Sequence, residues 1–152
     1  MHTVRRAELR DRDELAQLHL LLWPECELDQ EKEQVMALLT TGKCGTLPAA
    51  VFVADAGDGA LAGFIEVGMR SHADGCNVAH PVGFIEGWFV RQANRNHGVG
   101  RSLMRAAEQW ARSHDCAEIA SDALIDNEDS HRAHTALGYE VVDRCVHFRK
   151  SL

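Results

Sequence analysis

Long apolar runs are missing from this chain of 152 residues. Apolar stretches such as Leu18 to Leu22 and Phe84 to Val90 fall well short of the roughly 20 residues that a membrane-spanning helix needs. The N-terminus also lacks the apolar segment of a signal peptide. We therefore expect a cytoplasmic protein with no membrane partner, folded as a single domain over residues 1–152, because this length suits one core.

Paired cysteines are absent as well. The five cysteines are odd in number and widely spread, and no two have the C-x-x-C spacing of zinc or redox sites. We interpret them as reduced thiols with a structural role. His131 and His134 have an i, i+3 spacing that could touch a metal, but the sequence implies no further ligand, so we expect no metal site.

Positive charge is scarce between Glu25 and Glu33. The formal net charge is −7, and the segment from Glu25 to Glu33 carries five acidic residues against Lys32. Such a surface repels phosphate backbones and attracts cations. Nucleic acid is therefore not an expected partner, whereas a polycationic small amine is. The alternative is a solvated acidic helix face that only aids solubility.

Hydrophobic spacing predicts strands and helices along the whole chain, with no repeat, low-complexity run or linker. The order β-α-α-β-β-β-α-β-α-β-β indicates an α/β fold (α+β layered), in which helices flank a mixed central sheet. Two early helices should start at the caps Asp11 and Asp29 and end at Trp23-Pro24 and Gly42. The other expected elements are strands at 3–6, 49–54, 61–69, 82–90, 117–122, 139–143 and 145–149, and helices at 98–114 and 127–137.

The segment "RNHGVG" at residues 95–100 stands between a predicted strand and an amphipathic helix. At a helix N-terminus the first amide N–H groups have no partner and the dipole is positive. Glycine lets a phosphate approach the backbone closely, so Gly98 and Gly100 indicate an anion site. A dinucleotide-binding fingerprint would need a third glycine where Leu103 stands, and a P-loop would need G-K-[ST], so we reject both.

The order Arg95-x-x-Gly98-x-Gly100 resembles the pyrophosphate-binding motif of the GCN5-related N-acetyltransferase (GNAT) superfamily, R/Q-x-x-G-x-G/A, which holds acetyl-CoA. A second resemblance lies in Asn127 and "HTALGYE", similar to the family's later coenzyme-contacting segment. The expected element order matches the GNAT fold over nearly the whole chain. The resemblance implies acetyl-CoA as cosubstrate, without a metal. The coenzyme-binding residues that it implies are Trp88, Phe89, Val90, Arg95, Asn96, His97, Gly98, Val99, Gly100, Arg101, Asn127 and His134.

Several short segments resemble one branch of that superfamily, the aminoglycoside 6'-N-acetyltransferases. They are "LLWPE", "DGC", "FIEGWFV", "ASD" and "SHRAHTALGYE", and it is their joint order that counts. The resemblance implies direct transfer of an acetyl group to the 6'-amine in a ternary complex, antibiotic resistance and a homodimer. The acceptor-binding residues that it implies are Trp23, Glu25, Asp74, Glu86 and Asp122.

Glu86 also stands out from the residues alone. Strand alternation puts it on one face with Phe84, Trp88 and Val90, an apolar setting for a carboxylate. Burial there would cost several kcal/mol unless a cation, a hydrogen bond or protonation compensates. We predict that Glu86 binds an ammonium and, through water, takes its proton. The alternative is that a bulge or an edge location turns Glu86 into water, or that an arginine neutralises it.

Three further predictions concern the acceptor and the leaving group. Asp122 ends a strand at the carboxyl edge, where open α/β sheets bind ligands, or else caps a turn. Trp23 lines the pocket or packs in the core. Many family members place a tyrosine, as acid for the thiolate, where this chain has His134, and the only tyrosine, Tyr139, stands in a packing position. His134 is therefore the candidate third catalytic residue beside Glu86 and Asp122, with His147, water or no acid as alternatives.

Two other functions remain open from the residues. One is acetylation of a polyamine, another small amine or a protein amine. The other is a coenzyme-A-binding module without catalysis, which the missing tyrosine makes conceivable. Thiol release with kanamycin, spermidine and peptide acceptors separates these functions, because a module would release no thiol.

Overall fold

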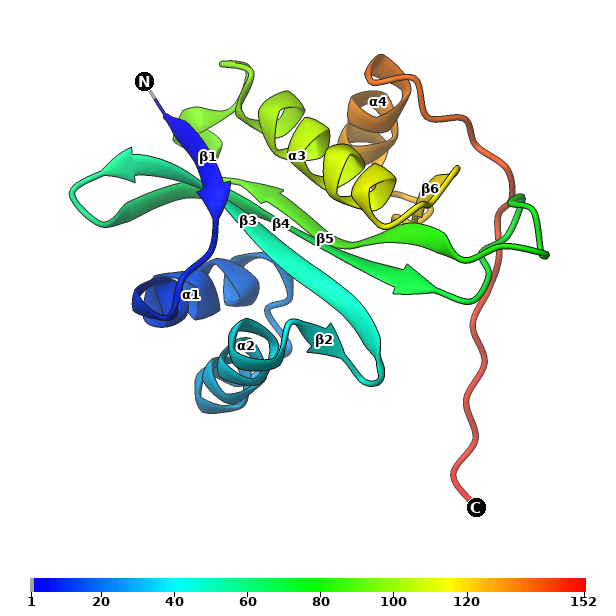
Figure 1. The fold of residues 1–152 in the computed structure, drawn as a ribbon, viewed down its shortest axis with the longest axis horizontal. Coiled ribbons are helices and arrows are strands. Elements are labelled where there is room, and N and C mark those ends of the chain that lie inside the picture. Colours follow the sequence, from blue (N-terminus) through cyan, green and yellow to red (C-terminus); the bar gives the residue numbers. More distant parts are fainter. Residues whose placement is uncertain (1) are drawn as a thin grey trace.

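The computed structural model describes residues 2–152 and is built on one mixed sheet between two layers of helices (Figure 1). The strand order is β1-β3-β4-β5-β6, with β2 paired to β3, and only β5 and β6 are parallel. This confirms the predicted fold class. The elements in chain order are β1 (Thr3–Arg6), η1 (Leu9–Asp11), α1 (Arg12–Leu22), α2 (Leu28–Thr41), β2 (Lys43–Cys44), β3 (Leu47–Gly57), β4 (Ala60–Arg70), β5 (Val82–Val90), η2 (Gln92–Asn94), α3 (Val99–Ser113), β6 (Ile119–Ser121) and α4 (Glu128–Ala136).

α1 and α2 cover one face of the sheet (Figure 1). Their buried side chains meet those of β3 and β4 in one apolar cluster that includes Leu15, Leu18, Val35 and Phe64. Burying large aliphatic and aromatic side chains of this kind stabilises a fold by roughly 1.5–3 kcal/mol each. This packing fixes the position of α1 and α2 against the strands, and with it the position of the acidic residues described below.

The ends of these two helices follow the predicted signals with one shift. α1 ends before Trp23-Pro24, where Trp23 has left the helical region. Gly42 ends α2 in the left-handed conformation at φ 64°. The predicted cap Asp29 is wrong, because Glu27 occupies the extended N-cap position and Asp29 lies inside the first turn, where its charge still complements the helix dipole.

α3 and α4 lie on the opposite face (Figure 1). α3 buries a stripe at helical spacing, including Val99, Leu103, Ala107 and Trp110, against β4 and β5. Tyr139, directly after α4, packs on the same cluster. No helix within residues 2–152 has both the length and the apolar composition needed to cross a bilayer.

The two strands predicted at 139–143 and 145–149 are wrong. The chain beyond Tyr139 carries no strand pairing within residues 2–152 and leads away from the sheet as an extended tail (Figure 1). Its apolar residues Val141, Val142, Val146 and Phe148 are exposed. Alternating apolar residues favour an extended backbone, but a strand also needs a partner for its N–H and C=O groups, and the sequence pattern does not supply one.

Candidate active site

A β-bulge in β5 decides where Glu86 lies. The pairing of β4 with β5 joins Glu66 to Gly87 and then Val67 to Ile85, so two residues of β4 span three of β5. Glu86 is the extra residue. A bulge bends its strand and interrupts the alternation of side chains between the two faces of a sheet.

The bulge overturns the predicted face of Glu86. Ile85 and Trp88 both pack in the cluster under α3, although an unbroken strand would put them on opposite faces. On the other face, a Cβ atom at Gly87 would lie 2.7 Å from the Trp23 ring. The prediction that Glu86 shares a face with Trp88 is therefore wrong, and the alternative of a bulge is confirmed.

Arg70, from the end of β4, holds Glu86. Its Nε and Nη2 atoms donate to the two carboxylate oxygens at 2.9 and 2.8 Å, and its guanidinium lies 3.5 Å from the centre of the Phe84 ring. The hydrogen bond to Glu86 raises the pKa of Arg70, and the negative charge of Asp122 acts in the same direction. The structure thus brings Glu86, Arg70 and Asp122 together. Since the two paired side chains are 44% and 30% exposed, solvent weakens the pair and a ligand can reach it.

Trp23 lies over the bulge and is half-buried. Its ring meets His19 edge-on at 5.2 Å and Phe64 at 6.3 Å between ring centres, so α1 holds it in place. The interpretation of Trp23 as a core-packing residue is confirmed, and its role in lining the acceptor pocket stays a prediction. Glu25 and Asp74 are exposed and lie on separate connections, between α1 and α2 and between β4 and β5.

A buried cluster of titratable side chains near the Arg70–Glu86 pair was missed by the sequence analysis. The His19 Nδ1 atom lies 2.8 Å from Glu31 Oε2, and His19 Nε2 lies 3.8 Å from Glu66 Oε2. Burial, and then the charges of Glu86 and Glu31, raise the pKa of Glu66 to about 7. The sequence contained a signal that could have identified Glu66, because strand alternation puts this carboxylate on the same buried face as Phe64.

The start of α3 has the backbone geometry expected for the predicted anion site. Gly98 is the N-cap in the left-handed conformation at φ 79°, and no side chain caps the helix. The N–H groups of the first turn therefore have no intrahelical or capping partner. Asn96 is also left-handed, at φ 63°, which curves the backbone around His97. Glycine is needed at position 100 for a different reason, which is space. A Cβ atom there would lie 3.1 Å from the Trp88 ring, so the lack of a side chain lets α3 start against Trp88.

Trp88 gives a separate sign that a ligand belongs on this side. Its indole N–H is buried and has no hydrogen-bond partner within residues 2–152, whereas buried donors are normally satisfied. The pairing of β5 with β6 ends at Ile85 and Ser121, so the edge of β5 from Glu86 onward is open. A phosphate-bearing ligand with carbonyl acceptors fits the groups present, with its phosphates at α3 and its acceptors near β5 and Trp88.

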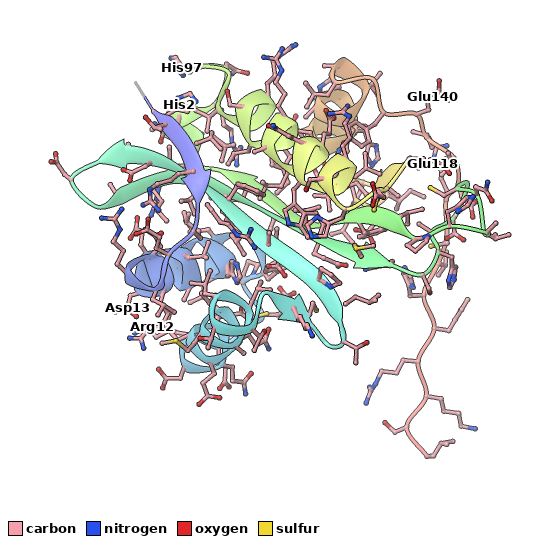
Figure 2. All side chains as sticks on the ribbon, viewed as in Figure 1. His2, Arg12, Asp13, His97, Glu118 and Glu140 are labelled. Carbon is pink, nitrogen blue, oxygen red and sulfur yellow. The ribbon has the colours of Figure 1, made fainter. Side chains whose placement is uncertain are left out.

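Other residues predicted to bind the coenzyme shape the same turn. Arg95 Nε donates to the Val90 carbonyl at 2.9 Å, which ties the turn to the end of β5, and its guanidinium lies 5.9 Å from the Phe89 ring centre. His97 is exposed at the start of α3 and, with His2, lines a depression of about 460 Å³ (Figure 2). Arg101 is exposed on the first turn of α3.

His134 stands where β5 and β6 separate. Its Nδ1 atom lies 2.7 Å from the Ser130 carbonyl and its Nε2 atom 2.8 Å from the Ser121 hydroxyl. A carbonyl only accepts, so Nδ1 donates to Ser130, and Nε2 shares a hydrogen bond with the Ser121 hydroxyl. The ring also meets Trp88 edge-on at 5.1 Å. Asn127 caps α4 by accepting from the Ser130 N–H at 3.1 Å.

Potential metal ligands do not gather in the part of the chain that the structure describes. No group of three or more histidine, cysteine, aspartate or glutamate side chains is arranged to hold one within residues 2–152. The His131 ring bonds to the Leu124 carbonyl at 2.9 Å. His147, the alternative acid, lies on the exposed tail, where its Nε2 atom is 3.5 Å from Cys145 Sγ.

Comparison with known proteins identifies close relatives of this arrangement. Residues 12–139 match the model of the acetyltransferase (GNAT) family. The chain is 39% identical to aminoglycoside N(6')-acetyltransferase type 1 of Stenotrophomonas maltophilia, over 99% of this chain and 94% of that protein. It is 38% identical to the enzyme of the same name from Klebsiella aerogenes, over 98% and 96%. The solved structure of AAC(6')-Iy in complex with the bisubstrate analog CoA-S-monomethyl-acetylneamine superposes with a TM-score of 0.88 at 30% identity, covering 100% and 99% of the two chains.

Proposed function

This chain belongs to the acetyltransferase (GNAT) family, and we propose that it transfers the acetyl group of acetyl-CoA directly to the 6'-amine of an aminoglycoside in a ternary complex. Relatives named for that activity match it over nearly their full length. A structural neighbour, AAC(6')-Iy, is in complex with the bisubstrate analog CoA-S-monomethyl-acetylneamine. Acetylation removes a positive charge from the antibiotic, which would weaken its attraction to RNA and so confer resistance.

The observation that carries this proposal is the Arg70–Glu86 pair at the bulge. The guanidinium stands where a substrate ammonium would bind, on a carboxylate that the bulge turns away from the core under α3. Asp122 adds negative charge nearby, and Trp23 borders the bulge. A polycationic acceptor can compete with Arg70 for Glu86, because the pair is partly exposed.

The chemistry needs a neutral amine and a stabilised oxyanion. An ammonium has no lone pair, so a base must first take its proton, and the carboxylates at the bulge are the candidates. The open edge of β5 from Trp88 to Val90 presents backbone N–H groups that could bind the developing oxyanion. Acetyl-CoA supplies a thioester whose thiol, with a pKa near 8.5, is a tolerable leaving group, so no covalent enzyme intermediate is required.

His134 is the proposed acid for the departing thiolate. In the protonated ring Nε2 donates to the Ser121 hydroxyl, 2.8 Å away. When Ser121 passes its own proton to the thiolate it takes the Nε2 proton, which leaves His134 neutral. The coenzyme would lie between these residues and the start of α3, where Gly98, Gly100 and the Trp88 indole N–H offer the donors it needs.

A homodimer in the cytoplasm also belongs to this proposal. The exposed apolar side chains of Val141, Val142, Val146 and Phe148 on the tail support self-association, because a tail with such residues gains free energy when they are covered. Size-exclusion chromatography with light scattering tests it. A monomer at micromolar concentration would contradict the dimer without affecting the proposed reaction.

The experiment that tests the function is thiol release from acetyl-CoA by the purified protein. Kanamycin should react rapidly, and a matched aminoglycoside with a 6'-hydroxyl should react far more slowly. Spermidine and a peptide serve as competing acceptors, and faster release with either would replace the aminoglycoside as substrate. Absence of release with all four, together with retained coenzyme A binding, would indicate a binding module.

Glu86→Gln tests the acceptor site directly. We expect it to lower kcat/KM for kanamycin by about 10²-fold or more, because the neutral amide cannot pair with an ammonium. Coenzyme affinity should stay unchanged, since the glycine turn lies on the opposite face of the sheet. Kinetics equal to those of the wild type would remove Glu86 from the mechanism.

A further inference from the structure

The His19 ring has a buried nitrogen without a partner. The residue is 4% exposed, and its Nε2 atom makes no hydrogen bond within residues 2–152. Its Nδ1 atom lies 2.8 Å from Glu31 Oε2, and a carboxylate only accepts, so Nδ1 carries the hydrogen. Burial lowers the pKa of His19, which keeps the ring neutral. Nε2 is therefore a bare acceptor that lacks a donor.

The polar atom facing this acceptor is an oxygen of Glu66, at 3.8 Å. When Glu66 is ionised, two acceptors face each other in a buried place, which is unfavourable. When Glu66 is protonated, its O–H supplies the donor that His19 lacks after a small movement of the side chain. With Glu66 ionised, the cluster therefore lacks the one proton that would join Glu66 to His19 Nε2 by a hydrogen bond. The titratable groups facing it are His19 from α1, Glu31 from α2, Cys44 from β2, and Glu86 from β5 with its partner Arg70 from β4.

Glu66 also lies at the reaction site. It pairs in register with Gly87, next to the bulge, and the charge of Glu86 raises its pKa. Both oxygens of Glu86 already accept hydrogen bonds from Arg70, whereas the Oε2 of Glu66 faces an acceptor. Binding of the ammonium and acceptance of its proton are therefore separated between two carboxylates at the bulge.

We propose that Glu66 accepts the proton of the acceptor ammonium and that His19, held by Glu31, is the positioning residue that stabilises the protonated form. The inference rests on the proposed acetylation. An N–H bond of the ammonium breaks and an O–H bond forms on Glu66, while the electron pair stays on nitrogen. That pair then attacks the thioester carbon, the C–S bond breaks, and its electrons leave with sulfur. The second N–H proton of the attacking nitrogen passes through solvent to the departing sulfur, so that the products are the neutral amide and the free thiol. After the amide departs, Glu66 returns its proton to water.

The test is the dependence of kcat/KM on pH, from about pH 5.5 to 9, with kanamycin and acetyl-CoA. The wild type should show an inflection near the raised pKa of Glu66, about 7, above which activity reaches its plateau. Glu66→Gln should lose this inflection and about 10²-fold or more of kcat/KM. Coenzyme binding, measured by calorimetry, should be unchanged and reports that the variant is folded.

Two further variants separate a chemical from a structural role. Glu66→Asp keeps a carboxyl but retracts it by one methylene, so it should lower the rate and retain an inflection, and it also serves if Glu66→Gln does not fold. His19→Asn should move the inflection to lower pH, because the protonated carboxyl loses its acceptor. Glu33→Gln, exposed on α2, is the matched control and should behave as the wild type.

Two outcomes distinguish the inference from the function on which it rests. If the wild type releases no thiol with kanamycin, the proposed function is wrong, and with it the role of Glu66 as base for that acceptor. If the wild type is active but Glu66→Gln retains the inflection near pH 7 with a rate within about threefold, Glu66 does not take the proton and the inference is overturned.

Discussion

Gly87→Ala adds a methyl group where the bulge meets Trp23. The new Cβ would lie 2.7 and 3.0 Å from two Trp23 ring atoms and 3.3 Å from a Phe64 ring atom, closer than carbon atoms pack. Phe64 is fully buried and cannot yield, whereas Trp23 is half-buried and can move outward. Overpacking of this kind costs about 1–3 kcal/mol, part of which should appear as displacement of Trp23 from the acceptor side.

We expect the free energy of unfolding to fall by about 1–2 kcal/mol and the KM for kanamycin to rise roughly tenfold, with coenzyme affinity unchanged. Denaturant titration and steady-state kinetics measure these effects. Gly83→Ala is the matched control, since its Cβ would lie 2.8 Å from that of Ala111 on the opposite face and should destabilise without changing the KM for the acceptor. Wild-type stability and acceptor KM in Gly87→Ala would refute the contact between Trp23 and the bulge.

The remaining predictions concern the coenzyme site and the buried carboxylate. Gly100→Val should weaken coenzyme A binding about tenfold or more in calorimetry, because even a Cβ there would lie 3.1 Å from the Trp88 ring, and unchanged affinity would contradict the placement of α3. The pKa of Glu66 is about 7 in the folded protein against an ordinary 4.5, so the folded state binds this proton more tightly and stability falls as pH rises from 4.5 to about 7. Glu66→Gln should remove that loss and raise the free energy of unfolding near pH 8 by up to ~3 kcal/mol, measured by urea titration at about pH 5 and 8; equal pH profiles for the two proteins would contradict the buried, raised carboxyl.

Most of the fold could be read from local patterns. The 82–90 strand, the helix that starts after Gly98 and the stop at Gly42 follow from alternation, helical spacing and glycine conformation, all of which depend on neighbouring residues. The anion site at α3 follows for the same reason. The tail from residue 140 could not be predicted, because strand pairing requires a partner that is distant in sequence or lies outside this chain.

The sequence by itself determined the residue types of the site, the order of its elements and, through the glycine turn and its neighbours, the resemblance to acetyltransferases. Only the tertiary structure decided which groups act together. The bulge at Glu86 arises from the pairing of β4 with β5, and it separated Glu86 from Trp88, which alternation had put on the same face. The packing of α1 and α2 on the sheet brought His19 and Glu31 to Glu66. Burial and charge then raised the pKa of Glu66, and both depend on residues far apart in sequence, so no local pattern contains them.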